Sequence, residues 1–315
     1  MNNFSGCQVL VTGGNGAVGS NLVRKLLDLN AKVVVLDDFS QSVRGNLPVN
    51  KKLDIVHGNI INPKILDKVF NKKYDFVFHL AARFANEMSV NDPMEDLRIN
   101  IQGTMQVLLK ASRQNPERFV YTSSSSIYGH QKTTTFSEKT IPLPSTPYAS
   151  SKLSGEHYCN AIHELYGLDY SIVRLSNSYG PFDPPGKFRN VIPNFMLNAV
   201  NGKDLIIFGT GKETRDFTYV DDCVDGILLA ASAHHHKNQV FNLGTGKETT
   251  IKKIADIILD LTQHRSKIVY RPMRTFDHIK RRRMDISKTR RLLNYKPVVK
   301  IEMGLAKTYE WFLNR

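Results

Sequence analysis

Features that mark membrane, secreted and metal-binding proteins are scarce in this sequence. No apolar run reaches the ~20 residues that a membrane-spanning helix needs. The first residues have neither the basic region nor the apolar stretch of a secretory signal. The three cysteines, Cys7, Cys159 and Cys223, lie far apart and match no metal-ligand spacing. These absences favour a soluble protein of a reducing compartment, and we expect it in the cytoplasm.

Acidic residues are few relative to basic ones, and the formal net charge is +14. A nucleic acid or a small phosphate-bearing ligand would each be attracted by such a charge. The one dense basic run, at 280–283, has no interleaved aromatic residues and no nucleic-acid-binding motif around it. We therefore expect a small anionic ligand and no nucleic acid. The triplet His234–His236 is expected to be a solvated loop, because consecutive histidines cannot all face one metal ion.

The amino-terminal stretch has the pattern of a dinucleotide-binding βαβ unit. An apolar run at 7–11 leads into a glycine-rich turn at 12–19, a helical pattern follows, and the β-branched run 32–36 ends at Asp37. The glycines allow the backbone to approach a pyrophosphate at the helix N-terminus, and Asp37 can accept hydrogen bonds from ribose hydroxyls. A carboxylate there repels a 2′-phosphate, which favours NAD over NADP. Arg44 lies close enough in sequence to keep that preference moderate.

The alternation of strands and helices continues beyond this unit and predicts an α/β fold with a doubly wound parallel sheet. Ligands of such sheets bind at the carboxyl ends of the strands. Gly13, Asp37, Ala81, Ser124 and Asn177 all follow predicted strands and are expected to converge there. Further strands are expected at 53–56, 76–80, 118–121 and 169–175, and further helices at 63–70, 96–112 and 148–165.

The composition changes near residue 177, where a turn-rich loop rich in proline and glycine begins. Short helices and strands follow, including predicted strands at 205–209 and 239–243. We expect residues 1–176, together with about 214–245, to form an NAD-binding Rossmann domain. Residues 177–315 are expected to form a smaller, discontinuous α/β lobe that binds the substrate.

Tyr148 and Lys152 are four residues apart on a predicted helix and therefore lie on one face, a single turn apart. An adjacent ammonium favours the phenolate, so Tyr148 is expected to act as a base closer to neutral pH than the ordinary tyrosine pKa of ~10 allows. The pair alone is weak evidence, since a helix edge with a lysine reaching to solvent has the same spacing. A cofactor and a substrate hydroxyl beside it would make the pair catalytic.

In order along the chain, the motifs resemble those of the extended short-chain dehydrogenases/reductases. The resemblance is to their nucleotide-sugar epimerase/dehydratase family, and most of all to the UDP-glucose 4-epimerase-like branch. It covers essentially the whole chain. The matching segments are the glycine loop 13–19, the strand end 79–82, Asn100, the serine motif 123–129, Tyr148 with Lys152, the segments 174–181 and 215–217, and the late pair Arg274 and Asp277.

The resemblance implies a role for each matching residue. The implied catalytic residues are Ser124, Tyr148 and Lys152. The implied NAD-binding residues are Gly13, Asn15, Gly16, Ala17, Val18, Gly19, Asp37, Asp38, Asn59, Ile60, Leu80, Ala81, Ala82, Asn100, Tyr148 and Lys152. The implied substrate-binding residues are Arg83, Asn86, Ser124, Asn177, Asn190, Arg215, Arg274 and Asp277.

Two positions depart from the family pattern. Asn59 stands where the family often has an aspartate that meets the adenine amino group, and an asparagine carbonyl can still accept that hydrogen bond. Phe276 precedes Asp277 where the family usually has glycine, so the loop that carries Arg274 and Asp277 is expected to have a different shape. Arg83, just after a strand end, would favour a carboxylated sugar if it faces the ligand; an outward-facing loop residue is the alternative.

The residues after Ser124 distinguish the branches of the family. Dehydratases carry Asp-Glu after the catalytic threonine, and decarboxylases carry a glutamate at the second of these places. Here both places are serines, Ser125 and Ser126, which cannot serve as an acid/base pair at neutral pH. The resemblance therefore implies 4-epimerisation of a nucleotide-diphosphate sugar through a transient 4-keto intermediate with tightly bound NAD.

A UDP-hexose, UDP-N-acetylhexosamine or UDP-uronic acid is the expected substrate, and a homodimer is the expected assembly. The first alternative is another NAD-dependent enzyme of the family: a dehydratase, a decarboxylase, or an epimerase of a GDP-, CDP- or dTDP-sugar. The second alternative is a non-catalytic NAD-binding regulatory protein, against which the intact trio of Ser124, Tyr148 and Lys152 argues.

Overall fold

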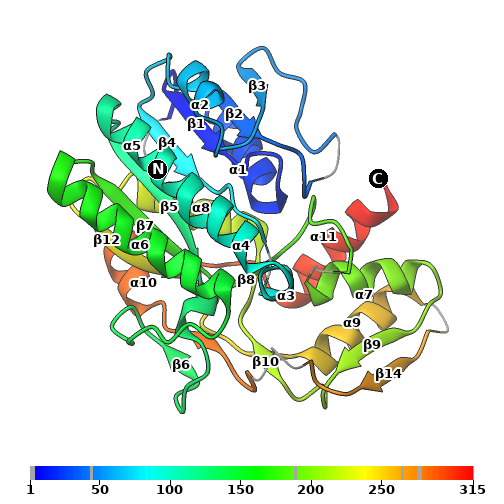
Figure 1. Cartoon of the computed structure of the whole chain (residues 1–315). Helices are drawn as coiled ribbons and strands as arrows, with labels where there is room; N and C mark the ends of the chain where they lie inside the picture. Colours follow the sequence, from blue (N-terminus) through cyan, green and yellow to red (C-terminus); the bar gives the residue numbers. More distant parts are fainter. Residues whose placement is uncertain are drawn as a thin grey trace.

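A computed structural model describes residues 4–42, 45–84, 86–187, 190–263, 266–274 and 279–314. Its centre is a parallel sheet of seven strands in the order β3-β2-β1-β4-β5-β7-β12 (Figure 1). The strand order reverses between β1 and β4, which is where ligands of open α/β sheets bind. This confirms the doubly wound α/β fold that the sequence predicts. The strands are β1 Gln8–Thr12, β2 Lys32–Asp37, β3 Leu53–His57, β4 Phe76–His79, β5 Arg118–Ser124, β7 Tyr170–Leu175 and β12 Gln239–Leu243.

Side chains of the central strands point alternately into two core layers. In β1, Val9 and Val11 belong to one buried cluster and Leu10 belongs to the other. A strand that is apolar on both sides needs a layer of helices on each face of the sheet. The first cluster includes α1 Ala17–Asp28 and α8 Val220–Ala231, and the second includes α2 Pro63–Val69, α5 Thr104–Gln114 and α6 Pro147–Tyr166.

The helical stretch predicted at 96–112 is present, but part of it is wound more widely than an α-helix. It consists of α4 Pro93–Asp96, the π-helix η1 Leu97–Gly103 and then α5. A π-helical turn changes which side chains point inward, and such turns occur frequently at functional sites. Asp96 and Asn100 are both buried at this place. Asp96, the last residue of α4, and Asn100, in the π-helix, both hydrogen-bond Ser151 near the start of α6.

A smaller lobe lies beside the carboxyl ends of the strands (Figure 1, lower right). It contains α7 Val191–Val200, β9 Leu205–Phe208, α9 Ile251–Thr262, β14 Ile268–Arg271 and α11 Ile301–Leu313. The parallel pair β9–β14 packs with the helices through buried side chains such as Phe195, Ile207, Ile254 and Leu305. The core of the lobe is continuous with the first core layer of the sheet.

Short elements connect the sheet and the lobe. The parallel pair of β8 and β11 aligns Asn177 with Phe217, β10 pairs with β13, and β6 pairs with β15. No helix in the described ranges is both long and apolar enough to cross a membrane. The remaining elements are α3 Asn86–Asn91, η2 Ser125–Tyr128, β6 Thr135–Phe136, β8 Asn177–Tyr179, β10 Thr214–Arg215, β11 Phe217–Tyr219, β13 Thr249–Thr250, β15 Arg283–Met284 and α10 Ser287–Leu293.

Candidate active site at the carboxyl ends of the strands

Two adjoining cavities lie where the carboxyl ends of the strands face the smaller lobe. Cavity 1, of about 410 Å³, runs along the glycine turn and the ends of β2, β4 and β5. Cavity 2, of about 460 Å³, lies between these strand ends and the lobe elements α7 and β9. Their walls share Phe84, Ser124, Ser176, Ser178 and Asn190. A ligand in one cavity therefore lies next to a ligand in the other, and Ser124 reaches both.

The turn between β1 and α1 brings bare backbone into the wall of cavity 1. Gly13 has a φ of +71°, and a Cβ there would lie 2.5 Å from the backbone nitrogen of Ala81. A Cβ at Gly19 would lie 2.1 Å from the Gly13 carbonyl oxygen, because α1 packs directly against the turn that precedes it. Glycine is required at both positions. The resulting cradle at the N-terminus of α1 fits a pyrophosphate.

The carboxylate of Asp37 is fixed at the end of β2, beside the glycine turn. It accepts hydrogen bonds from the backbone nitrogens of Asn15 at 2.9 Å and Phe39 at 2.8 Å. Burial raises the pKa of Asp37, and the two backbone amides oppose that shift. A carboxylate on this wall accepts hydrogen bonds from ribose hydroxyls and repels a 2′-phosphate. The cradle and Asp37 together fit NAD.

Asp38 and Asn59 form the next part of the wall. The Asn59 side-chain nitrogen donates to the Asp38 carboxylate at 2.8 Å, and the Asn59 side-chain oxygen accepts from the backbone nitrogen of Ile61 at 3.0 Å. That oxygen keeps a second lone pair, which suits the adenine contact expected from the sequence. The predicted cofactor-binding residues that line cavity 1 are Gly13, Gly16, Ala17, Val18, Gly19, Asp37, Asp38, Asn59, Ile60, Leu80, Ala81, Ala82, Tyr148 and Lys152.

Asn15 and Asn100, the other two residues that the sequence predicts to contact the cofactor, are not part of the wall of cavity 1. The Asn15 side chain donates to Ser42 Oγ at 2.6 Å. The Asn100 side chain donates to Asp96 at 2.8 Å and accepts from the backbone nitrogen of Arg83 at 2.7 Å. Both residues hold the segments that form the cavity. Their orientation follows from tertiary contacts, which the sequence motif does not contain.

The predicted catalytic trio comes together from β5 and the first turn of α6. Thr146 caps α6 by accepting from the Ala149 nitrogen at 3.2 Å, and Pro147 occupies the first turn. This start places Tyr148 and Lys152 in the wall of cavity 1 with exposed fractions of 6% and 3%. Ser124, at the end of β5, hydrogen-bonds to Tyr148. A hydroxyl donor and acceptor, a phenol and an ammonium therefore share one wall.

The protonation of Tyr148 differs from what the sequence predicts. Burial raises the pKa of Tyr148 above its ordinary value, the charge of Asp96 adds to the shift, and only the hydrogen bond between Tyr148 and Ser124 opposes it. The expectation that the adjacent Lys152 lowers the pKa of Tyr148 is therefore not met in the protein alone. The physical reason is that burial removes the phenolate from water and the nearby charge of Asp96 repels it.

Lys152 is also affected mainly by its burial. Burial lowers the pKa of Lys152 to about 8, while the carboxylates of Asp96 and Glu156 oppose the shift. The Lys152 nitrogen lies 4.8 Å from the centre of the Tyr121 ring, which favours the charged form. Lys152 is thus a cation at neutral pH that lies close to its titration point.

This titration predicts a pH dependence of stability in the protein without cofactor. The pKa of Lys152 is lower in the folded chain than the ~10.4 of an unfolded one, so the folded state binds fewer protons between about pH 8 and pH 10. We expect the cost of burying the ammonium to decrease as the pH rises from 7.5 to 9.5, which stabilises the protein by about 1–2 kcal/mol at this site.

The measurement is urea unfolding of the wild type and of Lys152→Met at both pH values. The wild type should gain stability relative to the variant, which has no group to titrate at this position. Equal changes in the two proteins would show that the Lys152 ammonium is not destabilised by burial.

Most of the predicted substrate residues surround cavity 2. Asn86, Ser124, Asn177, Asn190, Arg215 and Arg274 all line it. Asn86 also accepts a hydrogen bond from Thr146 Oγ1 at 2.8 Å and so supports the cap of the catalytic helix. Arg274 lies 3.3 Å from the Glu87 carboxylate and 4.3 Å above the Phe208 ring. Asp277 lies outside the described residues.

Arg83 lines cavity 1 and is not part of the wall of cavity 2. Its Nη1 lies 2.9 Å from the Asp92 carboxylate and 3.2 Å from the Asp92 carbonyl oxygen. Asp92 therefore holds Nη1 of Arg83, and the preference for a carboxylated sugar stays a prediction.

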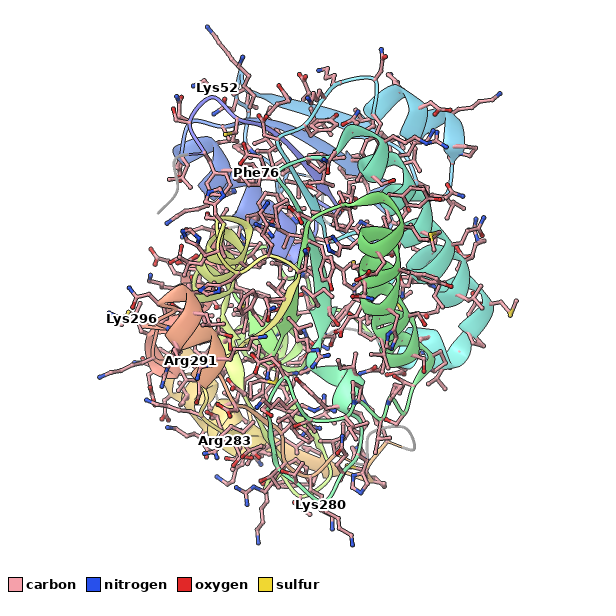
Figure 2. The ribbon with its side chains drawn as sticks, turned by 90° about the vertical axis from the view of Figure 1, so that its left-hand side faces the viewer. Lys52, Phe76, Lys280, Arg283, Arg291 and Lys296 are labelled. Carbon is pink, nitrogen blue, oxygen red and sulfur yellow. The ribbon has the colours of Figure 1, made fainter. Side chains whose placement is uncertain are left out.

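Arg282 is a cavity residue that the sequence analysis did not single out. It is 5% exposed, lines cavity 2 and donates to the Gly129 carbonyl oxygen at 3.4 Å. Its neighbours in the basic run point outward; Figure 2 shows Lys280 and Arg283 at the surface of the molecule. A period-two pattern with the buried Met284 and Ile286 could have identified Arg282 as inward-facing.

Comparison with known proteins finds relatives that align with nearly the whole chain. The model of the NAD dependent epimerase/dehydratase family matches residues 9–244. A UDP-glucose 4-epimerase of Mycolicibacterium smegmatis is 34% identical, and the alignment covers 98% of this chain and 99% of that protein. A UDP-N-acetyl-alpha-D-glucosaminuronate decarboxylase of Bacillus cytotoxicus is 32% identical over 96% of this chain and 97% of that protein.

Among solved structures, an epimerase of the methanogen Methanothermobacter thermautotrophicus is 42% identical and superimposes with a TM-score of 0.97. The match covers 99% of this chain and 93% of that one. Relatives with these levels of identity include both an epimerase and a decarboxylase. The choice between these reactions therefore depends on the residues of the site.

Proposed function

The chain belongs to the NAD-dependent epimerase/dehydratase family, and from that premise we propose that it is a 4-epimerase of a nucleotide-diphosphate sugar, with UDP-sugars favoured. The observation that carries the proposal is the pair of serines that follows Ser124. Ser125 and Ser126 line cavity 2 beside Ser124, and Ser126 accepts a hydrogen bond from Ser124 Oγ at 3.1 Å. A dehydratase or a decarboxylase needs a further acid or base at this place, and a serine hydroxyl cannot titrate near neutral pH.

The carboxylates that line cavity 2, among the residues that the structure describes, do not replace the missing acid. Glu87 is paired with Arg274 at 3.3 Å. Glu213 accepts from the nitrogen and hydroxyl of Thr210 at 3.1 and 3.0 Å, which holds the turn between β9 and β10. Neither carboxylate follows Ser124 in the chain, where the acids of the dehydratases and decarboxylases stand, which supports removal and return of hydrogen at one carbon and no elimination.

The roles of the residues follow from their positions. NAD bound in cavity 1 would supply the acceptor and then the donor of a hydride. Tyr148, as phenolate, takes the proton of the sugar 4-hydroxyl and gives it back when the carbonyl is reduced again, and Ser124 hydrogen-bonds the same oxygen and relays the proton. The Lys152 ammonium would hold ribose hydroxyls of the cofactor. Arg215 and Arg274 offer guanidinium groups in cavity 2 to the diphosphate, which suits bidentate hydrogen bonds.

The test is incubation of the protein and NAD with a panel of UDP-, dTDP-, GDP- and CDP-sugars, followed by NMR of the products. We expect conversion of at least one UDP-sugar into a mixture with its 4-epimer, with no net consumption of NAD. A 6-deoxy-4-keto or decarboxylated product would replace the 4-epimerase proposal with one of the other reactions of the family. A folded protein that releases NAD on denaturation but converts no sugar would favour a regulatory role.

A further inference from the structure

The segment Gly180–Lys187, here called the strap, connects the main sheet to the smaller lobe and passes along cavity 1. It follows β8 and precedes α7, and it contains Pro184 and Pro185, which restrict its backbone. Asp183 is 5% exposed and lines cavity 1. The strap therefore forms part of the wall around the cofactor.

Two asparagines tie the strap to the glycine turn. The Asn21 side chain donates to the carbonyl oxygens of Ala17 at 2.7 Å and Pro181 at 3.1 Å. The buried Asn46 side chain donates to the Asn15 carbonyl oxygen at 3.0 Å and, more weakly, to that of Phe182 at 3.5 Å. Each asparagine thus joins the glycine turn to the strap, and both segments line the same cavity.

Phe182 has a backbone conformation that bulky residues rarely adopt, with a φ of +70°. Left-handed backbone at a non-glycine residue is strained and persists only where the surroundings hold it, often at a ligand clamp. Two side chains pack against the Phe182 ring. The Arg24 guanidinium lies 4.6 Å from the centre of the Phe182 ring, and the Trp311 ring contacts it edge-on at 5.7 Å.

These contacts come from opposite ends of the chain. Arg24 is on α1, directly after the glycine turn, and donates to the Asn46 carbonyl oxygen at 2.9 Å. Trp311 is on the carboxyl-terminal helix α11 and packs on Phe312 at 5.0 Å, which is part of the core. At its other end, the strap is held by two hydrogen bonds between Gly186 and the Asn194 side chain on α7, at 2.8 and 3.0 Å.

We propose that the strap is a closure over the NAD site, held shut by Phe182 between Arg24 and Trp311, and that these contacts set how slowly NAD leaves. Phe182 and Trp311 are positioning residues, because they act through the strap and do not touch the reacting atoms. The strained backbone at Phe182 favours opening once the ring leaves its place, whereas the two aromatic contacts keep it in place. Slow release suits a reaction in which NAD is borrowed and returned. The inference rests on the NAD site and does not depend on the identity of the sugar.

The test measures NAD release in the absence of any sugar. Each protein is loaded with NAD and freed of excess, and released NAD is trapped by an unrelated NAD-consuming dehydrogenase whose NADH signal is followed. We expect Phe182→Ala and Trp311→Ala to release NAD at least 10-fold faster than the wild type. Leu313→Ala, an exposed position on the same helix, is the matched control and should release NAD at the wild-type rate.

The second measurement is the dependence of epimerase activity on the NAD concentration. The NAD concentration for half-maximal activity should rise in Phe182→Ala and in Trp311→Ala, and kcat should recover at saturating NAD.

Phe182→Gly provides a second variant, because glycine adopts the observed φ without strain while the ring is removed. Trp311 is the single tryptophan of the chain, so its emission reports the strap directly. In the wild type, the emission should change at the rate of NAD release. Folded Phe182→Ala and Phe182→Gly proteins with wild-type release rates would overturn the proposal. A protein that binds no NAD would overturn the cofactor site and the strap proposal with it. Faster NAD release from the strap variants, in a protein that converts no sugar, would leave the strap proposal intact and contradict only the proposed reaction.

Discussion

Tyr148→Phe is expected to lower the turnover of the nucleotide sugar by about 10²- to 10⁴-fold, which is the usual contribution of a positioned acid/base group. The variant removes one oxygen atom and leaves the ring. That ring contacts Phe84 edge-on at 5.8 Å, and nothing in this contact involves the hydroxyl. The fold, the wall of cavity 1 and the bound NAD should therefore be retained.

The measurement is the rate of 4-epimer formation by NMR, combined with the NAD content after denaturation. Tyr170→Phe is the matched control, because Tyr170 is also 6% exposed and its hydroxyl donates to Asn160 at 3.2 Å, away from both cavities. The control should turn over at the wild-type rate. Full turnover by Tyr148→Phe, with NAD in place, would exclude Tyr148 as the base.

The raised pKa of Tyr148 adds a condition to this role. Burial and the charge of Asp96 disfavour the phenolate in the protein alone, so the base needs positive charge nearby when it acts. Lys152, one helical turn away, is a cation below about pH 8, and oxidised NAD would bring a further positive charge when bound. We therefore expect the tyrosine to act as a base in the complex with oxidised cofactor.

Features that depend on neighbouring residues in the sequence were predictable. The glycine turn, the strand ends and the one-turn spacing of Tyr148 and Lys152 are local, and parallel strands necessarily bring their carboxyl ends to one edge. The seven-stranded sheet then places Gly13, Asp37 and Ser124 along the two cavities. These positions required no knowledge of side-chain packing.

Features that depend on tertiary partners were not predictable from the motifs. Asn100 lies in a π-helical segment, and its hydrogen bonds to Asp96 and Arg83 turn it away from cavity 1. Arg83 is directed by Asp92, which no family motif includes. The pKa of Tyr148 depends on how completely the ring is buried, and spacing on a helix carries no information about burial.

Glu156→Ala is expected to destabilise the protein by about 3–5 kcal/mol, since it leaves one charge of a buried ion pair without its partner. The Glu156 carboxylate lies 2.7 Å from Nη2 and 3.0 Å from Nε of Arg174, and both side chains are 6% exposed. Arg174 continues through Nη1 to the Tyr128 hydroxyl at 2.9 Å, which in turn donates to Asn242 at 2.8 Å. The ion pair thus joins the catalytic helix α6 to β7, η2 and β12.

The pair lies directly behind the catalytic residues. Glu156 is one turn after Lys152 on α6 and accepts a hydrogen bond from Ser123, the residue before Ser124. Although burial lowers the pKa of the Arg174 guanidinium, the carboxylate of Glu156 raises it by more, so the arginine keeps its charge in the core. Removal of the carboxylate leaves that charge unpaired, and the protein must unfold locally or admit water to satisfy it.

The measurement is the free energy of unfolding from urea titration, with Glu302→Ala as the control. Glu302 forms a pair with Lys253 at 3.0 Å in which both side chains are more than half exposed, so its loss should cost less than about 1 kcal/mol. The double variant Glu156→Leu with Arg174→Met should recover much of the lost stability, because an apolar pair of similar size leaves no charge uncompensated. A Glu156→Ala loss no larger than that of the control would mean that Arg174 reaches solvent or another anion. In that case α6, and with it Tyr148 and Lys152, would have to be held in place mainly by apolar packing.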